Sequence, residues 1–166
     1  MGRTLVRVTV GLVLALILFT SGWLVARTGM GTTVDRTSLA EHERQFSDRM
    51  RGVTLNGSFT VTGREDRPHR PDRYDIASVE KVGDGLWRFS ARLVHEGTDV
   101  TLPIVVPMQW HGDTPVISMT DYSIPGLGTF TCRVFFYGDL YSGTWQHGDK
   151  VGGHMFGRIE KTVAAP

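Results

Sequence analysis

The chain contains one cysteine, Cys132, and that scarcity already limits its chemistry. A single thiol excludes an intramolecular disulfide and every zinc site built on two or more cysteines. In an extended strand, Phe130, Val134 and Phe136 lie on the same face as Cys132, because side chains alternate with a period of two. We therefore expect Cys132 to be a small buried hydrophobic residue, as free cysteines commonly are.

The short motifs of common enzymatic chemistry are also missing. The sequence has no G-x-S-x-G nucleophile elbow and no phosphate-binding glycine loop, since Gly152 and Gly153 follow a valine but open no helix. Cys132 has apolar neighbours that give it no activating base. We therefore expect a protein that is not an enzyme, with no catalytic residues and no cofactor.

Clusters of one charge sign are absent as well. After Gly31 the chain carries fifteen basic and seventeen acidic residues, a net charge of −2 over that part. Basic and acidic residues alternate there and form no positively charged stripe. Nucleic acid is therefore not expected as a partner.

One long apolar run is present, near the amino terminus. Arg3 and Arg7 precede Val8–Ala26, nineteen residues without a charge, and Arg27 follows them. At a rise of about 1.5 Å per residue, a helix of this length nearly spans a hydrocarbon core of roughly 30 Å. The alternative is a cleaved secretory signal, for which the run offers no good A-x-A site. Residues 1–31 are thus expected to be a membrane anchor, or a signal peptide, followed by a linker.

The charges that flank this run predict its orientation. Two arginines on a short amino-terminal tail favour keeping that tail in the cytoplasm. The expected location is a bacterial inner (cytoplasmic) membrane, crossed once, with the rest of the chain on the extracytoplasmic side. A cleaved signal would place the rest of the chain on that same side.

A short amphipathic helix is predicted over residues 38–51. Ser38 and Glu41 have the spacing of a capping box at its start. The residues of its apolar stripe are Leu39, Phe46 and Met50. Because so thin a stripe is marginal unless it packs on something, two alternatives stay open. The helix is either a cap that closes one end of the following domain or a solvated stalk that lifts it off the bilayer.

From residue 52 to residue 161 the pattern changes to an alternation of period two, typical of half-buried strands. The expected strands begin at Val53, Tyr74, Leu86, Val100, Thr114, Thr129, Tyr141 and Gly153. Eight short strands joined by tight turns predict an all-β fold, either an antiparallel up-and-down barrel of lipocalin-like architecture or a sandwich. Residues 162–166 would form a tail.

Two segments depart from this regular pattern. Pro103 and Pro107 share one parity of the fourth strand, and because proline cannot donate to a ladder, this strand should lie at an edge or be bent there. The segment Gly63–Arg73 combines four arginines, three acids and two prolines, and is expected to be a loop that buries nothing. It is either an anion-binding or docking loop, or a solvated connection whose charges pair among themselves.

Several motifs carry a resemblance to known sequences. They are Trp87-Arg88-Phe89, Ile124-Pro125-Gly126-Leu127-Gly128, Gly143-Thr144-Trp145 and Gly152-Gly153-His154-Met155-Phe156-Gly157. Together they resemble a recurrent group of short bacterial proteins with an amino-terminal hydrophobic segment and a small lipocalin-like β-domain. The resemblance covers about Tyr74 to Ile159. It implies that architecture, and it carries no known activity, substrate or catalytic residue.

The last hairpin supplies the candidate ligand site. By strand parity, Tyr141, Gly143 and Trp145 face inward together with Gly157 of the final strand. The two glycines leave room on that face, and we expect the indole of Trp145 to pack over one of them; the alternative is space for a ligand. If a ligand binds, the expected binding residues are Tyr141, Trp145 and His147, and the ligand is a small apolar or aromatic molecule.

The tripeptide His-Gly-Asp occurs twice, at His111–Asp113 and at His147–Asp149. Histidine and aspartate would suit a divalent metal if both turns lay at one end of the fold. Three strands separate the turns, however, which puts them at opposite ends of a meander, and Gly-Asp is ordinary turn sequence. No metal site is expected.

Three classes of function follow from these patterns. The first is a non-enzymatic, membrane-tethered extracytoplasmic β-domain with an envelope structural or binding role, for which an envelope protein is a possible partner. The second is a carrier of a small apolar ligand, and the third is a metal-dependent hydrolase that uses the His-Gly-Asp turns. A closed cavity of several hundred Å³ lined by Tyr141 and Trp145 would favour the carrier, whereas a filled core would remove it.

Overall fold

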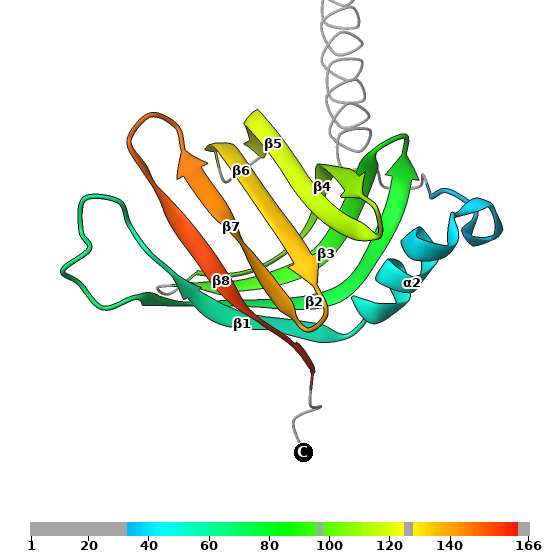
Figure 1. Cartoon of the computed structure of the whole chain (residues 1–166), viewed down its shortest axis with the longest axis horizontal. Coiled ribbons are helices and arrows are strands. Elements are labelled where there is room, and N and C mark those ends of the chain that lie inside the picture. Colours follow the sequence, from blue (N-terminus) through cyan, green and yellow to red (C-terminus); the bar gives the residue numbers. More distant parts are fainter. Residues whose placement is uncertain (1–32, 96–97, 125–127, 163–166) are drawn as a thin grey trace, which may run out of the picture.

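The computed structural model describes residues 33–95, 98–124 and 128–162, and in them two short helices precede a closed antiparallel barrel (Figure 1). The helices are η1 (Arg36–Ser38) and α2 (Glu41–Arg49). The strands are β1 (Val53–Phe59), β2 (Arg70–Gly83), β3 (Leu86–His95), β4 (Thr98–His111), β5 (Thr114–Ile124), β6 (Gly128–Tyr137), β7 (Leu140–His147) and β8 (Val151–Lys161). Each strand pairs with the next, and β1 pairs with β8. The all-β prediction is confirmed, and the fold is a barrel and not a sandwich.

The expected membrane anchor, residues 1–31, and most of the expected tail lie outside the described residues. Within the described part of the chain, no helix has the length and the apolar character needed to cross a membrane.

Burial follows the period-two pattern that the sequence predicts. On β6, Cys132, Val134 and Phe136 are buried, whereas Arg133 and Phe135 between them are exposed. Buried apolar residues of β1 to β7 join Phe46 of α2 in one cluster, and Met155 and Ile159 of β8 are partly buried against it. The core of the protein is therefore the interior of the barrel.

The predicted loop Gly63–Arg73 is shorter than expected, because β2 begins at Arg70 and pairs there with the end of β1. Pro71 is tolerated because it is the second residue of the strand, close to where the ladder begins. Asp72 is 7% exposed, which contradicts the expectation that this segment buries nothing. Tyr74 lies two residues further along the same face of β2, and its hydroxyl interacts with the Asp72 carboxylate inside the barrel.

Helix α2 begins three residues later than predicted, at Glu41, and the proposed capping box has the wrong register. The Ser38 hydroxyl donates to the Asp35 carbonyl at 2.7 Å, so this residue stabilises η1 instead. At the true start of α2, the Glu43 carboxylate accepts from the Ala40 amide at 3.2 Å. Only this half of a capping box exists, because an alanine side chain cannot accept a hydrogen bond in return.

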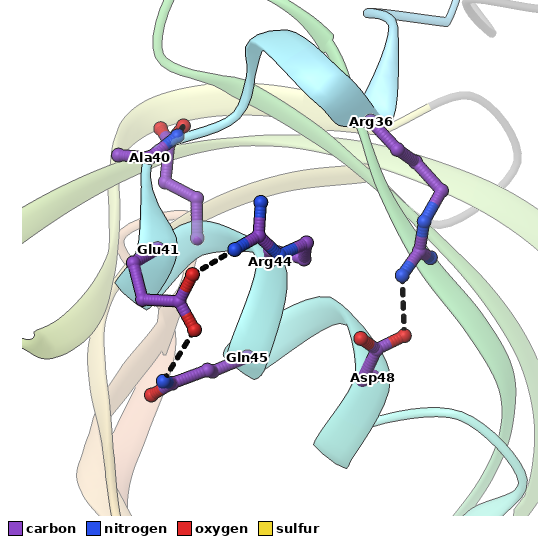
Figure 2. Close-up of polar contacts among 7 residues, drawn as sticks. Arg36, Ala40, Glu41, Arg44, Gln45 and Asp48 are labelled. Atoms are coloured by element: carbon purple, nitrogen blue, oxygen red, sulfur yellow. Dashed lines mark hydrogen bonds and ion pairs between the residues drawn. The ribbon is translucent and has the colours of Figure 1, made fainter.

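Polar contacts run along the solvent-facing side of α2. Figure 2 shows the Glu41 carboxylate in contact with Arg44 and with Gln45, which donates to it at 2.7 Å. The same figure shows Arg36 of η1 reaching Asp48 at 2.6 Å. Exposed ion pairs contribute little to stability in water. The position of α2 therefore depends on its opposite, apolar face.

That apolar face closes one end of the barrel. Phe46 and Met50 are 2% and 0% exposed, and the Phe46 ring meets Trp87 of β3 edge-on with centroids 6.0 Å apart. The hydroxyl of Ser47 donates to the β2 carbonyl of Val79 at 2.6 Å. The helix is thus a cap, and the stalk alternative is wrong.

Strands β4 and β5 pair over only four residue pairs, next to the turn that joins them. The Met108 amide donates to the Gly85 carbonyl beside β3 at 2.8 Å. Because amides point alternately to the two sides of a strand, Pro103 and Pro107 turn their nitrogens toward β5. They have no hydrogen to donate, so the ladder stops there. β4 is therefore not an edge strand, because it pairs with β3 and with β5, but its pairing with β5 ends where the prolines lie.

The connections between strands alternate between the two ends of the barrel. The turns β2–β3, β4–β5 and β6–β7 lie at the end that α2 covers. The connections β1–β2 and β7–β8 lie at the opposite end, called the loop end below, where the β1–β2 loop extends away from the strands (Figure 1).

Candidate ligand site

A cavity of about 500 Å³ lies inside the barrel. All eight strands contribute to its wall, which is mostly aliphatic and aromatic. Its residues are Leu55, Phe59, Asp72, Arg73, Tyr74, Ile76, Phe89, Ala91, Leu102, Ile104, Val106, Ile117, Met119, Ile124, Phe130, Cys132, Val134, Phe136, Tyr141, Trp145 and Met155. Ligand pockets in proteins have volumes of about 300–1,000 Å³ and similarly apolar walls. The interior therefore has the size and the chemistry of a small-molecule site.

Aromatic rings separate this cavity from α2. Trp110 of β4 packs against both Phe46 of α2 and Trp87 of β3, with ring centroids 5.8 Å and 6.1 Å apart. None of these three residues borders the cavity. The α2 end is therefore filled by side chains, and the hollow part of the interior lies beyond them.

Tyr141 lies across a pair of facing glycines. Gly57 of β1 is paired with Gly157 of β8. A Cβ added to Gly57 would lie 2.5 Å from the Tyr141 Oη, and a Cβ added to Gly157 would lie 2.7 Å from the Tyr141 Cε1. Only glycine leaves space for this ring. Tyr141 is 1% exposed, and its hydroxyl has no hydrogen-bond partner among the described residues. Burial, and to a smaller extent the charge of Asp72, raises the pKa of Tyr141 well above its ordinary value.

The prediction that Trp145 packs over Gly143 or Gly157 is wrong. Tyr141 occupies the space over Gly157, and a Cβ on Gly143 would meet β6 backbone. Trp145 instead meets Phe59 of β1 edge-on, with ring centroids 5.6 Å apart. Strands in a barrel are staggered, so an inward side chain reaches diagonal neighbours as well as its direct partner. The Trp145 indole nitrogen is buried and has no partner in the described structure.

Three polar or charged residues of β2 border the cavity: Asp72, Arg73 and Tyr74. The Arg73 guanidinium is more than half exposed and pairs with the Asp75 carboxylate at 3.0 Å, so Asp72 is the buried charge of this wall. The Tyr74 hydroxyl donates to the Asp72 carboxylate; burial, followed by the charge of that carboxylate, raises the pKa of Tyr74 well above its ordinary value. A second negative charge beside a buried carboxylate is unfavourable. The interior is thus better suited to a neutral group than to an anion.

Cys132 borders the cavity as a thiol and not as a thiolate. Burial raises the pKa of Cys132 to about 11. A hydrogen bond with the Met119 backbone and the charge of Arg133 both lower this pKa, but their effect is smaller than that of burial. The thiol is therefore protonated at neutral pH. The expectation of a small buried hydrophobic residue is confirmed.

The predicted binding residues separate into two groups. Tyr141 and Trp145 belong to the cavity wall, but His147 is exposed and does not border the cavity. The His147 ring stacks on Phe130 with centroids 4.5 Å apart and planes 8° apart, and Phe130 does border the cavity. His147 is the direct partner of Phe130 across β6 and β7, so it lies beside this wall residue on the same face of the sheet, near the loop end.

The two His-Gly-Asp turns lie at opposite ends of the barrel, as expected. His111–Asp113 joins β4 to β5 beside α2, and His147–Asp149 leads from β7 into β8 at the loop end. In the described ranges, no group of three or more histidine, cysteine, aspartate or glutamate side chains is close enough to hold a metal ion.

Sequence reasoning missed the β1 and β2 part of this site. Tyr74 has the inward parity of its strand, so its place in the wall was available from the pattern. Asp72 has the same parity, but its charge and the neighbouring prolines made it look like part of a loop. The contact of Phe59 with Trp145 depends on the stagger of the barrel and has no signal in the sequence.

Comparison with known proteins gives no relatives. No protein-family model, no curated protein and no solved structure matches the chain. The proposal of a function therefore depends on the cavity and the residues around it.

Proposed function

We propose that the barrel binds a small, mainly apolar molecule in its interior and carries out no chemistry on it. The observation that carries this proposal is the 500 Å³ cavity with its almost entirely apolar wall. An empty apolar cavity costs stability, because its lining atoms lose dispersion contacts and no water compensates for them. A ligand of matching size would restore those contacts, and this contribution favours binding.

The polar atoms in and around the wall support a neutral ligand with a hydrogen-bond acceptor. Among the described residues, the buried Tyr141 hydroxyl and Trp145 indole nitrogen have no hydrogen-bond partner, and leaving such a donor unpaired costs about 1–3 kcal/mol. A carbonyl or hydroxyl oxygen of a ligand would accept from one of them after a small movement of its ring. The buried carboxylate of Asp72 disfavours an anionic group at this depth.

The surroundings of the cavity favour binding over catalysis. The Cys132 thiol is protonated at neutral pH, and the two histidine-containing turns lie apart at opposite ends of the barrel. We therefore do not propose the metal-dependent hydrolase that the repeated tripeptide suggests.

Titration with dodecanol, a neutral chain with one hydroxyl, tests this function in the purified full chain. We expect saturable binding that changes the fluorescence of Trp145, so Trp145→Phe should lose most of the signal. In Ala91→Phe the added ring occupies part of the cavity, because Ala91 is part of its wall, and binding should weaken. Equal uptake by Ala91→Phe and by the original chain, or no uptake by the original chain, would overturn the proposal.

We further propose that binding takes place on the outer side of a bacterial cytoplasmic membrane. The apolar run Val8–Ala26 and the arginines before it support this location. Cell fractionation and protease treatment of spheroplasts test it. We expect the chain in the membrane fraction and the barrel open to external protease, and a barrel that is protected until lysis would contradict the proposed orientation.

A further inference from the structure

A second hollow, of about 290 Å³, lies in the β1–β2 loop at the loop end of the barrel. Residues of the loop and of the adjoining strand ends form it, together with His154 of β8. Its walls include the cationic residues Arg64, Arg67 and Arg70, and Glu65 is the one acid among them. The hollow therefore carries a net positive charge.

The acid in this wall is already engaged with the backbone of the loop. The Glu65 carboxylate accepts from the Gly63 amide at 2.8 Å. In contrast, the guanidinium groups of Arg64 and Arg67 have no hydrogen-bond or ion-pair partner among the described residues. The alternative that the charges of this loop pair among themselves is thus wrong for these two arginines. Two unpaired guanidinium groups beside one hollow are suited to a carboxylate or phosphate, which they bind with paired N–H donors.

The two hollows share Phe59 as a wall. Phe59 is the last residue of β1, and the loop that forms the second hollow starts directly after it. Phe59 therefore borders both the apolar interior and the basic loop. A molecule that passes Phe59 would have its apolar part in the barrel and its end among the arginines.

We propose that the ligand is an anionic amphiphile whose apolar chain occupies the barrel while its charged headgroup is bound by Arg64 and Arg67. This inference rests on the proposed binding function and adds the class of ligand. The charge distribution supports the division, because Asp72 disfavours an anion inside, whereas the loop attracts one. The neutral acceptor expected at Tyr141 would be a polar group within the chain, and the headgroup lies outside the interior.

Three probes separate the contributions of chain and charge at neutral pH. Dodecanoate has both the chain and the charge, dodecanol has the chain alone, and acetate has the charge alone. We expect dodecanoate to bind more tightly than dodecanol and acetate to bind weakly or not at all. In Arg64→Gln/Arg67→Gln, dodecanoate binding should weaken by about tenfold and dodecanol binding should stay the same. Added salt should weaken the binding of dodecanoate selectively.

A matched double variant, Arg44→Gln/Arg51→Gln, removes the same charge at the α2 end and should leave all three affinities unchanged. Thermal unfolding of each variant checks that the barrel is folded; the charge-reversing pair Arg64→Glu/Arg67→Glu should weaken dodecanoate binding further. Equal binding of dodecanoate and dodecanol, unaffected by either loop variant, would refute the headgroup site and leave the proposed function standing. Tight acetate binding that depends on the loop arginines would instead indicate a site for free anions and would also refute the amphiphile. If dodecanol does not bind at all, the proposed function itself fails.

Discussion

Because Ala91 borders the cavity, a larger side chain at this position should stabilise the unliganded protein. In a filled core the same kind of change would destabilise the protein. Ala91 is 4% exposed and forms part of the cavity wall, so the longer side chain in Ala91→Leu extends into empty space. Three added carbon atoms at about 0.8 kcal/mol each, less about 0.5–1 kcal/mol of side-chain entropy, give a gain of about 1–2 kcal/mol. For a chain of this size the melting temperature should rise by about 2–8 °C.

Thermal unfolding followed by circular dichroism measures this shift, and urea unfolding measures the free energy. Ala91→Val is the graded control and should give a smaller gain, while both variants lower the affinity for dodecanol. A loss of about 1–3 kcal/mol in Ala91→Leu, the usual cost of overpacking, would show that the interior is filled and would refute the reasoning behind the ligand site.

Four further changes test other parts of the structure. Phe46→Ala should lower the free energy of unfolding by about 3–5 kcal/mol in urea, because the ring anchors the α2 cap; a loss below about 1 kcal/mol would show that α2 is only loosely attached. Gly57→Ala should cost about 1–3 kcal/mol, since its Cβ meets β8 backbone, whereas the control Gly83→Ala meets nothing closer than 3.8 Å and should cost less; equal losses would argue against the close approach of β1 and β8 at this glycine. Because burial raises its pKa to about 11, Cys132 should react with a thiol reagent at pH 8 only after unfolding, and rapid labelling of the folded protein would contradict this. The raised pKa of Tyr141 means that the unfolded chain loses its proton first, so the free energy of unfolding should fall as the pH rises above about 10, and Tyr141→Phe should reduce the slope of that fall in pH-dependent denaturation.

The number and order of the strands were predictable because strand parity is a local property of the sequence. The alternation of buried and exposed residues on β6 follows directly from it. The prolines of β4 also gave a correct signal, since a missing amide hydrogen limits pairing wherever the strand lies. Charge was the misleading signal. Asp72 was predicted to lie in a solvated loop because it is charged, and its position beside Tyr74 inside the barrel is visible only in the structure.

The cavity itself could not be predicted from parity. Parity indicates which residues face inward, but whether their side chains fill the interior depends on the diameter and stagger of the closed barrel. Tyr141 illustrates the limit: its inward direction was predicted, and its position across Gly57 follows only from the pairing of β1 with β8. The basic hollow depends likewise on the path of the β1–β2 loop, which carries no periodic pattern.

The facing glycines of β1 and β8 also have a consequence for how the chain folds. Every other pairing in the barrel joins consecutive strands and can form locally, whereas the contact between Asn56 and Glu160 spans 104 positions. Closing so long a loop costs entropy that local hairpins avoid, so we expect this pairing to limit the folding rate. The closure brings Gly57 and Gly157 together under the ring of Tyr141. The step that completes the barrel is therefore the step that encloses its cavity, and a ligand present during folding would be trapped by it.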